Sequence, residues 1–321
     1  MRIFGLIAVL LIMGISLTAA AGTPVFHAGV ARPSVTGEKP FEMLVWYPTE
    51  ADEVAWQAGP FTMSATRNAV VAPGRFPIVL LSHGGGVGGG TPLILREIPA
   101  ALARRGFIVI APFHGKVGLS GRTVQIRRAL DAVVADPRFA SHVDQTRLGM
   151  LGFSLGAAVT LELAGAVPNP AHLVAYCASH PHDAMSCDHA PDGNNGTAPG
   201  ATPEPTEPVA SLPLKAIVLM DPYAVLFQRP ELAGVSVPVL IFRPADSALP
   251  AGANAIGLAA ALPRSPQLQT IPGGHFVFTD ICSPSLKASS PEVCEDPPGV
   301  DRAAVHVALQ AQIIGFFTKN L

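Results

Sequence analysis

"RLGMLGFSLGAAVTLELAG", residues 147–165, places Ser154 between two glycines in the order Gly-x-Ser-x-Gly. An apolar run precedes the serine and an alanine-rich run follows it, so the stretch predicts a buried strand, a sharp turn and a helix. The glycines permit a strained turn that exposes the hydroxyl, and the start of the helix presents backbone N–H groups to developing negative charge. The stretch therefore predicts a nucleophilic serine; an ordinary glycine-rich turn is the alternative.

The rest of the chain alternates apolar and helical runs in the same way. Strands are expected at 41–48, 76–84, 107–114, 147–154, 214–222, 237–246 and 267–276. Helices are expected at 91–106, 123–136, 155–165, near 251–262 and over the closing "DRAAVHVALQAQIIGFFTKNL". Strands that are apolar on both faces and separated by helices form parallel sheets covered on both sides. The sequence thus predicts an α/β fold with a mainly parallel central sheet.

Length and composition favour one domain. The chain has 321 residues, of which 49% are hydrophobic, enough to bury a full core. We expect a single domain over 22–321 with an irregular insertion at about 168–211, which is too short and too polar to form its own core. The formal net charge of −2 gives no field that would attract nucleic acid.

The first residues have the pattern of a signal peptide. Arg2 is followed by an apolar region over about 3–17 and by three alanines at 19–21. This predicts a signal peptide over 1–21, a mature chain that starts near Gly22, and a periplasmic or secreted protein without a stable membrane span. An uncleaved anchor is the alternative, but a spanning helix needs about 20 apolar residues.

Four cysteines form two local pairs, Cys177 with Cys187 and Cys282 with Cys294. An even number of cysteines in an exported chain predicts two short-loop disulfides. Because histidines accompany the first pair, a zinc site within 177–189 is the alternative, although the spacing is not that of a standard zinc finger. We expect no metal.

A serine hydroxyl needs a base, and the base needs an orienting acid. On this type of sheet the chain order is serine, acid, histidine. His275, in "IPGGHFVF", follows the last expected strand and is the predicted base. Asp246 and Asp221 each follow an expected strand at the edge where such sheets bind ligands. We predict Asp246 as the acid, with Asp221 as the alternative.

The glycine-rich "SHGGGVGGG", residues 82–90, also follows an expected strand. Dinucleotide binding would require an acidic residue at the end of the next strand, and that strand has none. We instead expect the backbone N–H groups of Gly85 and Leu155 to stabilise an oxyanion. His83, His114 and Phe153 are expected to shape the pocket, and no cofactor is expected.

These motifs together resemble the α/β-hydrolase superfamily over residues 40–321. "WYP" (46–48), "GRFPIVLLSHGGG" (74–86), "GFSLG" (152–156), "YCASHPHDAMSC" (176–187) and "CEDPPGVDRAAVH" (294–306) further resemble the predicted dienelactone hydrolase group of exported bacterial proteins, which is related to platelet-activating-factor acetylhydrolases. True dienelactone hydrolases use a cysteine nucleophile, so Ser154 does not imply their substrate. The acetylhydrolases take the acid after the sixth strand, here Asp221, whereas most α/β-hydrolases take it after the seventh, here Asp246.

The resemblance implies a serine hydrolase that cleaves small carboxylic esters through an acyl-enzyme. One alternative is a lipid-directed acyl hydrolase, of the acetylhydrolase or phospholipase A2 type. The other is a catalytically silent binding protein that keeps the hydrolase fold, against which the complete set of serine, acid and histidine argues.

Overall fold

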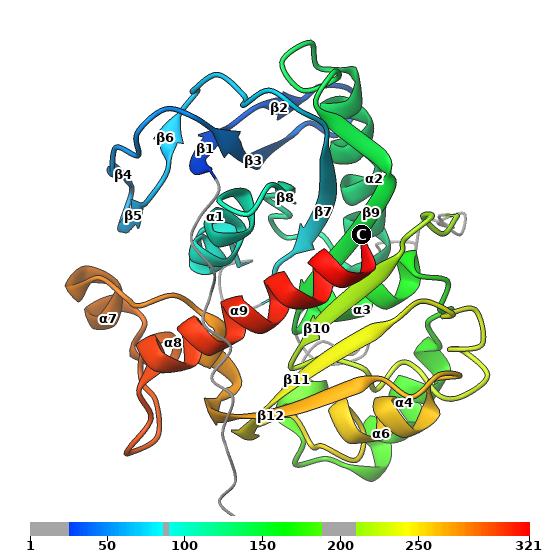
Figure 1. The fold of residues 1–321 in the computed structure, drawn as a ribbon. Coiled ribbons are helices and arrows are strands. Elements are labelled where there is room, and N and C mark those ends of the chain that lie inside the picture. The colour runs from blue at the N-terminus through cyan, green and yellow to red at the C-terminus, as the bar shows by residue number, and fades with distance from the viewer. Residues whose placement is uncertain (1–25, 86–89, 188–209) are drawn as a thin grey trace, which may run out of the picture.

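The computed structural model describes residues 26–85, 90–187 and 210–321; the predicted signal peptide lies outside them. Ten strands of the described chain form one sheet, in the order β12-β11-β10-β9-β7-β8-β3-β1-β6, with β2 paired to β3 (Figure 1). They are β1 (His27–Ala31), β2 (Ser34–Val35), β3 (Phe41–Thr49), β6 (Thr66–Arg67), β7 (Phe76–Ser82), β8 (Ile108–Pro112), β9 (Val143–Phe153), β10 (Ala216–Met220), β11 (Val239–Asp246) and β12 (Gln267–Gly274). A separate hairpin joins β4 (Trp56–Ala58) to β5 (Phe61–Met63).

The six strands from β8 to β12 across the sheet are parallel, which confirms the predicted fold class. The amino-terminal strands differ, because β3 pairs antiparallel with β8, β1 and β2. Residues 50–74 were expected to be irregular but contain β4, β5 and β6. These three are two or three residues long, too short to carry a period-2 pattern.

Helices cover both faces of the sheet. They are η1 (Pro92–Leu95), α1 (Glu97–Ala103), α2 (Leu119–Ala135), α3 (Leu155–Leu163), α4 (Pro170–Ser179), α5 (Ala184–Cys187), α6 (Ala255–Ala261), η2 (His275–Phe278), α7 (Pro284–Ser289), α8 (Pro291–Cys294) and α9 (Arg302–Asn320), where η marks a 3₁₀ helix. The apolar sides of α2, α3, α4 and α6 pack on one face, and those of α1 and α9 pack on the other. In Figure 1, α1 and α9 lie in front of the sheet, and α2 and α3 lie behind it.

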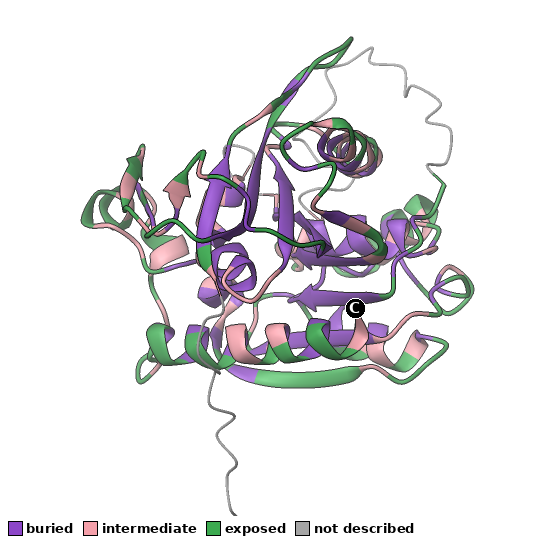
Figure 2. Cartoon of the chain, turned by 45° about the horizontal axis from the view of Figure 1, so that its top comes forward, coloured by how far each residue is buried: buried purple, intermediate pink, exposed green. Residues whose placement is uncertain are grey.

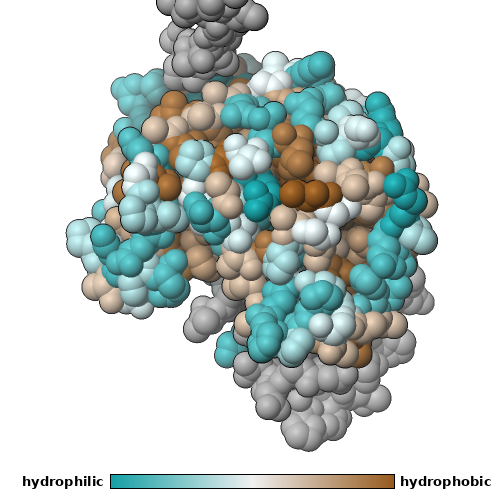
Figure 3. Space-filling model, turned by 90° about the horizontal axis from the view of Figure 1, so that it is seen from below, coloured by the Kyte–Doolittle hydropathy of each residue, from teal (hydrophilic) through white to brown (hydrophobic). Residues whose placement is uncertain are grey.

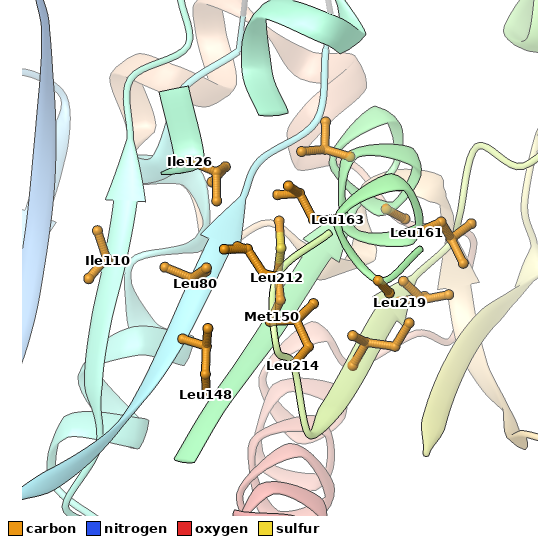
Figure 4. Close-up of a cluster of buried hydrophobic side chains, with 14 of the residues drawn as sticks. Leu80, Ile110, Ile126, Leu148, Met150, Leu161, Leu163, Leu212, Leu214 and Leu219 are labelled. Atoms are coloured by element: carbon orange, nitrogen blue, oxygen red, sulfur yellow. The ribbon is translucent and has the colours of Figure 1, made fainter. Parts of the chain in front are cut away.

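Successive residues of a strand face opposite sides of the sheet, so each buried strand contributes to two cores. In β7, Leu80 belongs to the core under α2 and α3, whereas Val79 belongs to the core under α1 and α9. Figure 4 shows Leu80, Ile110 and Met150 gathered with the side chains of the first core. Figure 2 shows the central strands buried along their length, in contrast to the edge strand β12, which is mostly exposed.

The predicted irregular insertion at about 168–211 begins with two helices, α4 and α5, so this part of the expectation is wrong. The Asn169 side chain accepts a hydrogen bond from the His172 N–H at 3.0 Å, and Pro170 occupies the first turn of α4. These are ordinary signals for the start of a helix. Residues 188–209, which hold the most turn-rich part of the insertion, lie outside the described chain.

Within the described ranges, no helix is long and apolar enough to cross a bilayer. Exposed large apolar side chains such as Val54, Val70 and Val307 come from separate parts of the chain. On the face seen in Figure 3, hydrophobic and hydrophilic residues are interspersed.

Candidate active site

Ser154 occupies a strained turn between β9 and α3. Its φ of 54° and ψ of −120° lie outside the regions that ordinary residues adopt, at a cost of about 1–3 kcal/mol. Both flanking glycines are needed because the backbone packs too closely for a Cβ atom. A Cβ on Gly152 would lie 2.2 Å from the Gly156 carbonyl oxygen, and one on Gly156 would lie 1.9 Å from the Ser82 carbonyl oxygen. The close packing of the backbone at this turn therefore explains why the motif has glycine on both sides of the serine.

The register of the parallel strands brings the candidate residues together at one edge of the sheet. Phe153 pairs with Met220, so the residues that follow them, Ser154 and Asp221, lie side by side. Gly152 pairs with Ser82, which places the loop that starts at His83 on the other side of the serine. All these strands present their carboxyl ends here, the usual position of ligand sites in open α/β sheets.

A continuous hydrogen-bonded chain links an acid, a histidine and the serine. Nδ1 of His275 lies 2.6 Å from Oδ2 of Asp221, and Nε2 lies 3.1 Å from Oγ of Ser154. Asp221 is 1% exposed and His275 is 6% exposed, whereas Ser154 is only half-buried. A buried carboxylate on Nδ1 fixes the tautomer in which Nε2 can accept the serine proton.

The predicted pairing of Asp246 with His275 is wrong, because the alternative acid, Asp221, holds that position. Met220 pairs with Phe242, which sets Asp221 level with Arg243 and three residues short of Asp246. Asp246 pairs with Gly274, beyond an irregularity in the strand register, and it is exposed. The β11 loop contributes its next residue instead, since the Ser247 hydroxyl donates to Oδ2 of Asp221 at 2.5 Å. Sequence reasoning gave no signal for Ser247.

His275 is held by its neighbours from both sides. The ring centroid of Phe153 lies 4.9 Å from that of His275, and the ring of Phe276 meets the imidazole edge-on at 5.0 Å. Gly273 has a φ of 108°, and a Cβ there would lie 2.6 Å from a Val277 methyl group. Phe153, predicted as a pocket residue, is 1% exposed and supports the imidazole instead of lining a pocket.

The two predicted oxyanion donors lie next to each other. Leu155 is the first residue of α3, so its N–H has no acceptor within the helix. Gly85 lies against it, because a Cβ on Gly85 would be 3.4 Å from a Leu155 methyl group. A carbonyl oxygen near Ser154 would thus approach both backbone segments from which the donors are expected.

His83 and His114 were predicted to shape the pocket, but both side chains are fully buried. Nδ1 of His83 lies 2.8 Å from the Gly84 carbonyl oxygen, and its Nε2 accepts the His114 N–H at 3.3 Å. Burial, with Arg122 nearby, lowers the pKa of His83 to about 3, and burial next to His83 holds the pKa of His114 well below its usual value. Both imidazoles are therefore neutral in the folded protein.

This burial predicts a loss of stability in acid. Each histidine is neutral when folded but binds a proton below about pH 6.5 when unfolded, so stability is complete above that pH and falls as the pH drops. At pH 5 each should cost about 2 kcal/mol. The variant His114→Gln should lose about 2 kcal/mol less than the parent between pH 8 and pH 5, measured by urea denaturation.

The control is His182→Gln, because this histidine is exposed in the folded protein. Its difference in unfolding free energy between the two pH values should match that of the parent. An equal pH dependence for His114→Gln and the parent would contradict the prediction.

Both predicted disulfides are present, Cys177–Cys187 and Cys282–Cys294. The first withdraws both of its thiolates from the zinc site considered as an alternative. It also joins α4 to α5. Residue Ser186 of α5 is in turn bonded to the segment after Asp221, because the Tyr223 hydroxyl donates to the Ser186 carbonyl at 2.8 Å. The same segment is held by Asn254 at the start of α6, whose carboxamide oxygen accepts the Ala224 N–H at 2.8 Å.

A cleft of about 1100 Å³ opens between α4, α6 and residues 225–229. Tyr176, His180, Phe227 and Arg229 are among its lining residues, and neither Ser154 nor His275 is. The hydrogen-bonded chain, and not this cleft, therefore defines the candidate site.

The chain is similar to a solved structure, a ferulic acid esterase from Streptomyces cinnamoneus. The two share 18% sequence identity over 94% of this chain and 92% of that one, with a TM-score of 0.62. No family model matches the chain, and no curated protein matches it. At this identity the likeness establishes the fold, and the chain has the α/β-hydrolase fold.

Proposed function

We propose that the protein is an exported serine hydrolase that cleaves carboxylic esters. The observation that carries the proposal is the unbroken chain from Oδ2 of Asp221 through His275 to Oγ of Ser154. A serine in a strained turn, a histidine within reach of its hydroxyl and a buried acid behind the histidine are the parts that acyl transfer to serine requires.

The reaction follows from the positions of these groups. Ser154 Oγ attacks the ester carbonyl as His275 Nε2 removes its proton, and the N–H groups of Leu155 and Gly85 stabilise the oxyanion. The tetrahedral intermediate collapses, His275 returns the proton to the leaving alcohol, and an acyl-enzyme remains. Water, deprotonated by His275, then releases the acid and restores Ser154.

Two observations bear on the acyl group. The similar solved structure is described as a ferulic acid esterase, which supports an ester of an aromatic acid. The acid after β10 is the arrangement that the resemblance to acetylhydrolases implies, which supports short acyl groups on a lipid as the second candidate. The resemblance to the dienelactone hydrolase group stays a prediction.

Export is supported by the two disulfides, because such bonds persist in oxidising compartments. The leader pattern over 1–21 supports it independently. A location in the periplasm or outside the cell would give the enzyme access to esters that do not enter the cytoplasm.

The proposal is tested by titrating the protein with a fluorophosphonate and assaying p-nitrophenyl esters from acetyl to palmitoyl alongside methyl ferulate. We expect one equivalent of label on Ser154 and a parallel loss of activity, since the probe reacts with activated serines. A preference for methyl ferulate would support the aromatic acyl group, and a preference for acetyl esters would support the lipid candidate. A protein that hydrolyses none of these esters and takes no label would be a binding protein, contrary to the proposal.

A further inference from the structure

Arg122 is a buried cation, and among the described residues its hydrogen-bond partners are all carbonyl groups. It lies at the start of α2, is 2% exposed, and donates from Nε to the Val117 carbonyl at 3.0 Å. One of its terminal nitrogens donates to the carbonyls of His83 at 2.8 Å and Gly84 at 3.2 Å. Among the described residues, no carboxylate lies within ion-pair distance of it. Burying a charge without a counter-charge is costly, so the position of this guanidinium calls for a functional reason.

A second donor holds the same carbonyl. Because Nε2 of His83 accepts the His114 N–H, the neutral ring carries its proton on Nδ1, which donates to the Gly84 carbonyl. Gly90 packs closely against the Gly84 carbonyl, since a Cβ on Gly90 would lie 2.5 Å from the carbonyl oxygen. The Gly84 carbonyl is thus fixed by two donors and lies close to Gly90.

The orientation of this carbonyl determines that of the next N–H. In a trans peptide the carbonyl and the N–H point in opposite directions across the planar unit. The Gly84 carbonyl and the Gly85 N–H belong to one such unit. Holding the oxygen at Arg122 therefore turns the Gly85 N–H away from the guanidinium, and Gly85 lies beside Leu155 at the turn that carries Ser154.

The charge of Arg122 acts in the same direction. Burial lowers the pKa of Arg122 only to about 10, so the group stays cationic at neutral pH. A cation at the carbonyl end of the peptide polarises it and raises the positive potential at its N–H end. In a buried setting such fixed dipoles stabilise developing charge far more than they would in water.

We propose that Arg122 is a positioning residue for ester hydrolysis: with His83 it locks the Gly84–Gly85 peptide so that the Gly85 N–H donates to the oxyanion, and its charge offsets the negative charge of the tetrahedral intermediate. This inference rests on the proposed function. Arg122 touches no reacting atom and acts through the peptide that it holds.

The test compares Arg122→Met, which removes charge and donors, with Arg122→Lys, which keeps the charge but loses the branched set of donors. For each, kcat and KM are measured on p-nitrophenyl acetate and normalised to the fraction of Ser154 that a fluorophosphonate titrates. Inhibition by a trifluoromethyl ketone, which forms a tetrahedral adduct with the serine, is measured in parallel. We expect Arg122→Met to lower kcat by about 10- to 100-fold, less than the ~10²–10³ cost of deleting a donor, because the N–H remains but loses its fixed direction.

KM should stay within about threefold, and the inhibition constant of the ketone should rise in proportion to the loss in kcat/KM, because only the tetrahedral species uses the oxyanion site. A merely structural role would lower the titratable fraction and leave both normalised values unchanged. The loss for Arg122→Lys should be smaller, since the lysine retains the positive charge.

Arg128→Met is the matched control. Arg128 lies on the same helix and also donates to backbone carbonyls, those of Lys39 and Thr36 at 2.8 Å, but it is only half-buried, and these partners belong to the segment between β2 and β3. A second pair keeps the test decisive if Arg122→Met does not fold. His83→Asn retains an N–H near the position of Nδ1, whereas His83→Gln does not, so only His83→Gln should lose turnover.

The inference is overturned if Arg122→Lys and Arg122→Met both match Arg128→Met in normalised kcat and in ketone affinity. If the two Arg122 variants do not fold, it is overturned when His83→Gln matches Arg128→Met in the same two values. Its failure differs from failure of the proposed function, in which the parent takes no fluorophosphonate or Ser154→Ala keeps its activity.

Discussion

Ser154→Ala is expected to lower kcat for p-nitrophenyl acetate on the order of 10⁴- to 10⁶-fold and to leave the fold intact. The methyl group cannot attack the ester, and His275 loses the hydroxyl that lies 3.1 Å from its Nε2. Residual turnover should come from the oxyanion donors acting on water. Initial rates at saturating ester, with circular dichroism to verify folding, measure the effect.

Ser179→Ala is the control for this variant, because Ser179 is exposed on α4 and, among the described residues, its hydroxyl bonds only within its own helix and to His180. It should retain the turnover of the parent. If Ser154→Ala kept its activity within tenfold of the parent, another group would be the nucleophile.

The sequence predicts most of the fold because its signals are local. β7 and the second half of β9 are buried, mainly apolar runs, and the helices that follow them begin at glycine- or proline-marked turns. Elements that lack this contrast were missed. β1 is the five-residue "HAGVA", and α4 was hidden by the turn-rich composition of the segment around it, although Asn169 and Pro170 mark its start.

The residues of the candidate site also differ in whether the local sequence predicts them. Ser154 and His275 follow from motifs because each occupies a turn that requires glycine, and that requirement appears in the local sequence. Arg122 left a weaker signal, an arginine on the apolar side of α2 four residues before the buried Ile126. The choice of acid depends on strand register and on the direction of a loop, and neither is encoded next to the aspartates.

Register also explains why the sequence favoured the wrong aspartate. Asp221 and Asp246 both end a buried strand, and both precede a loop on the ligand side of the sheet. The difference is that β11 extends beyond β10 at this edge, and Asp246, which pairs there with Gly274, is exposed to solvent. Asp221 instead takes a φ of 38°, a conformation that a non-glycine residue rarely adopts, which points to a constrained position.

Asp221→Asn is accordingly expected to lower kcat by about 10⁴-fold, whereas Asp246→Asn should stay within about threefold of the parent. The amide cannot accept the Nδ1–H of His275 with its nitrogen or balance the charge of the imidazolium, so the imidazole loses both its tautomer and its counter-charge.

Both variants are assayed on one short ester over pH 5 to 9, with active-site titration to count functional molecules. Asp246→Asn serves as the matched control, since it makes the same chemical change at an exposed carboxylate one residue from Ser247. The expected pattern is a collapse of kcat at every pH for Asp221→Asn alone. If Asp246→Asn collapsed and Asp221→Asn kept most of its turnover, the hydrogen bond of 2.6 Å between Asp221 and His275 would not be the one that supports the base, and the β11 loop would have to move to bring its carboxylate to the imidazole.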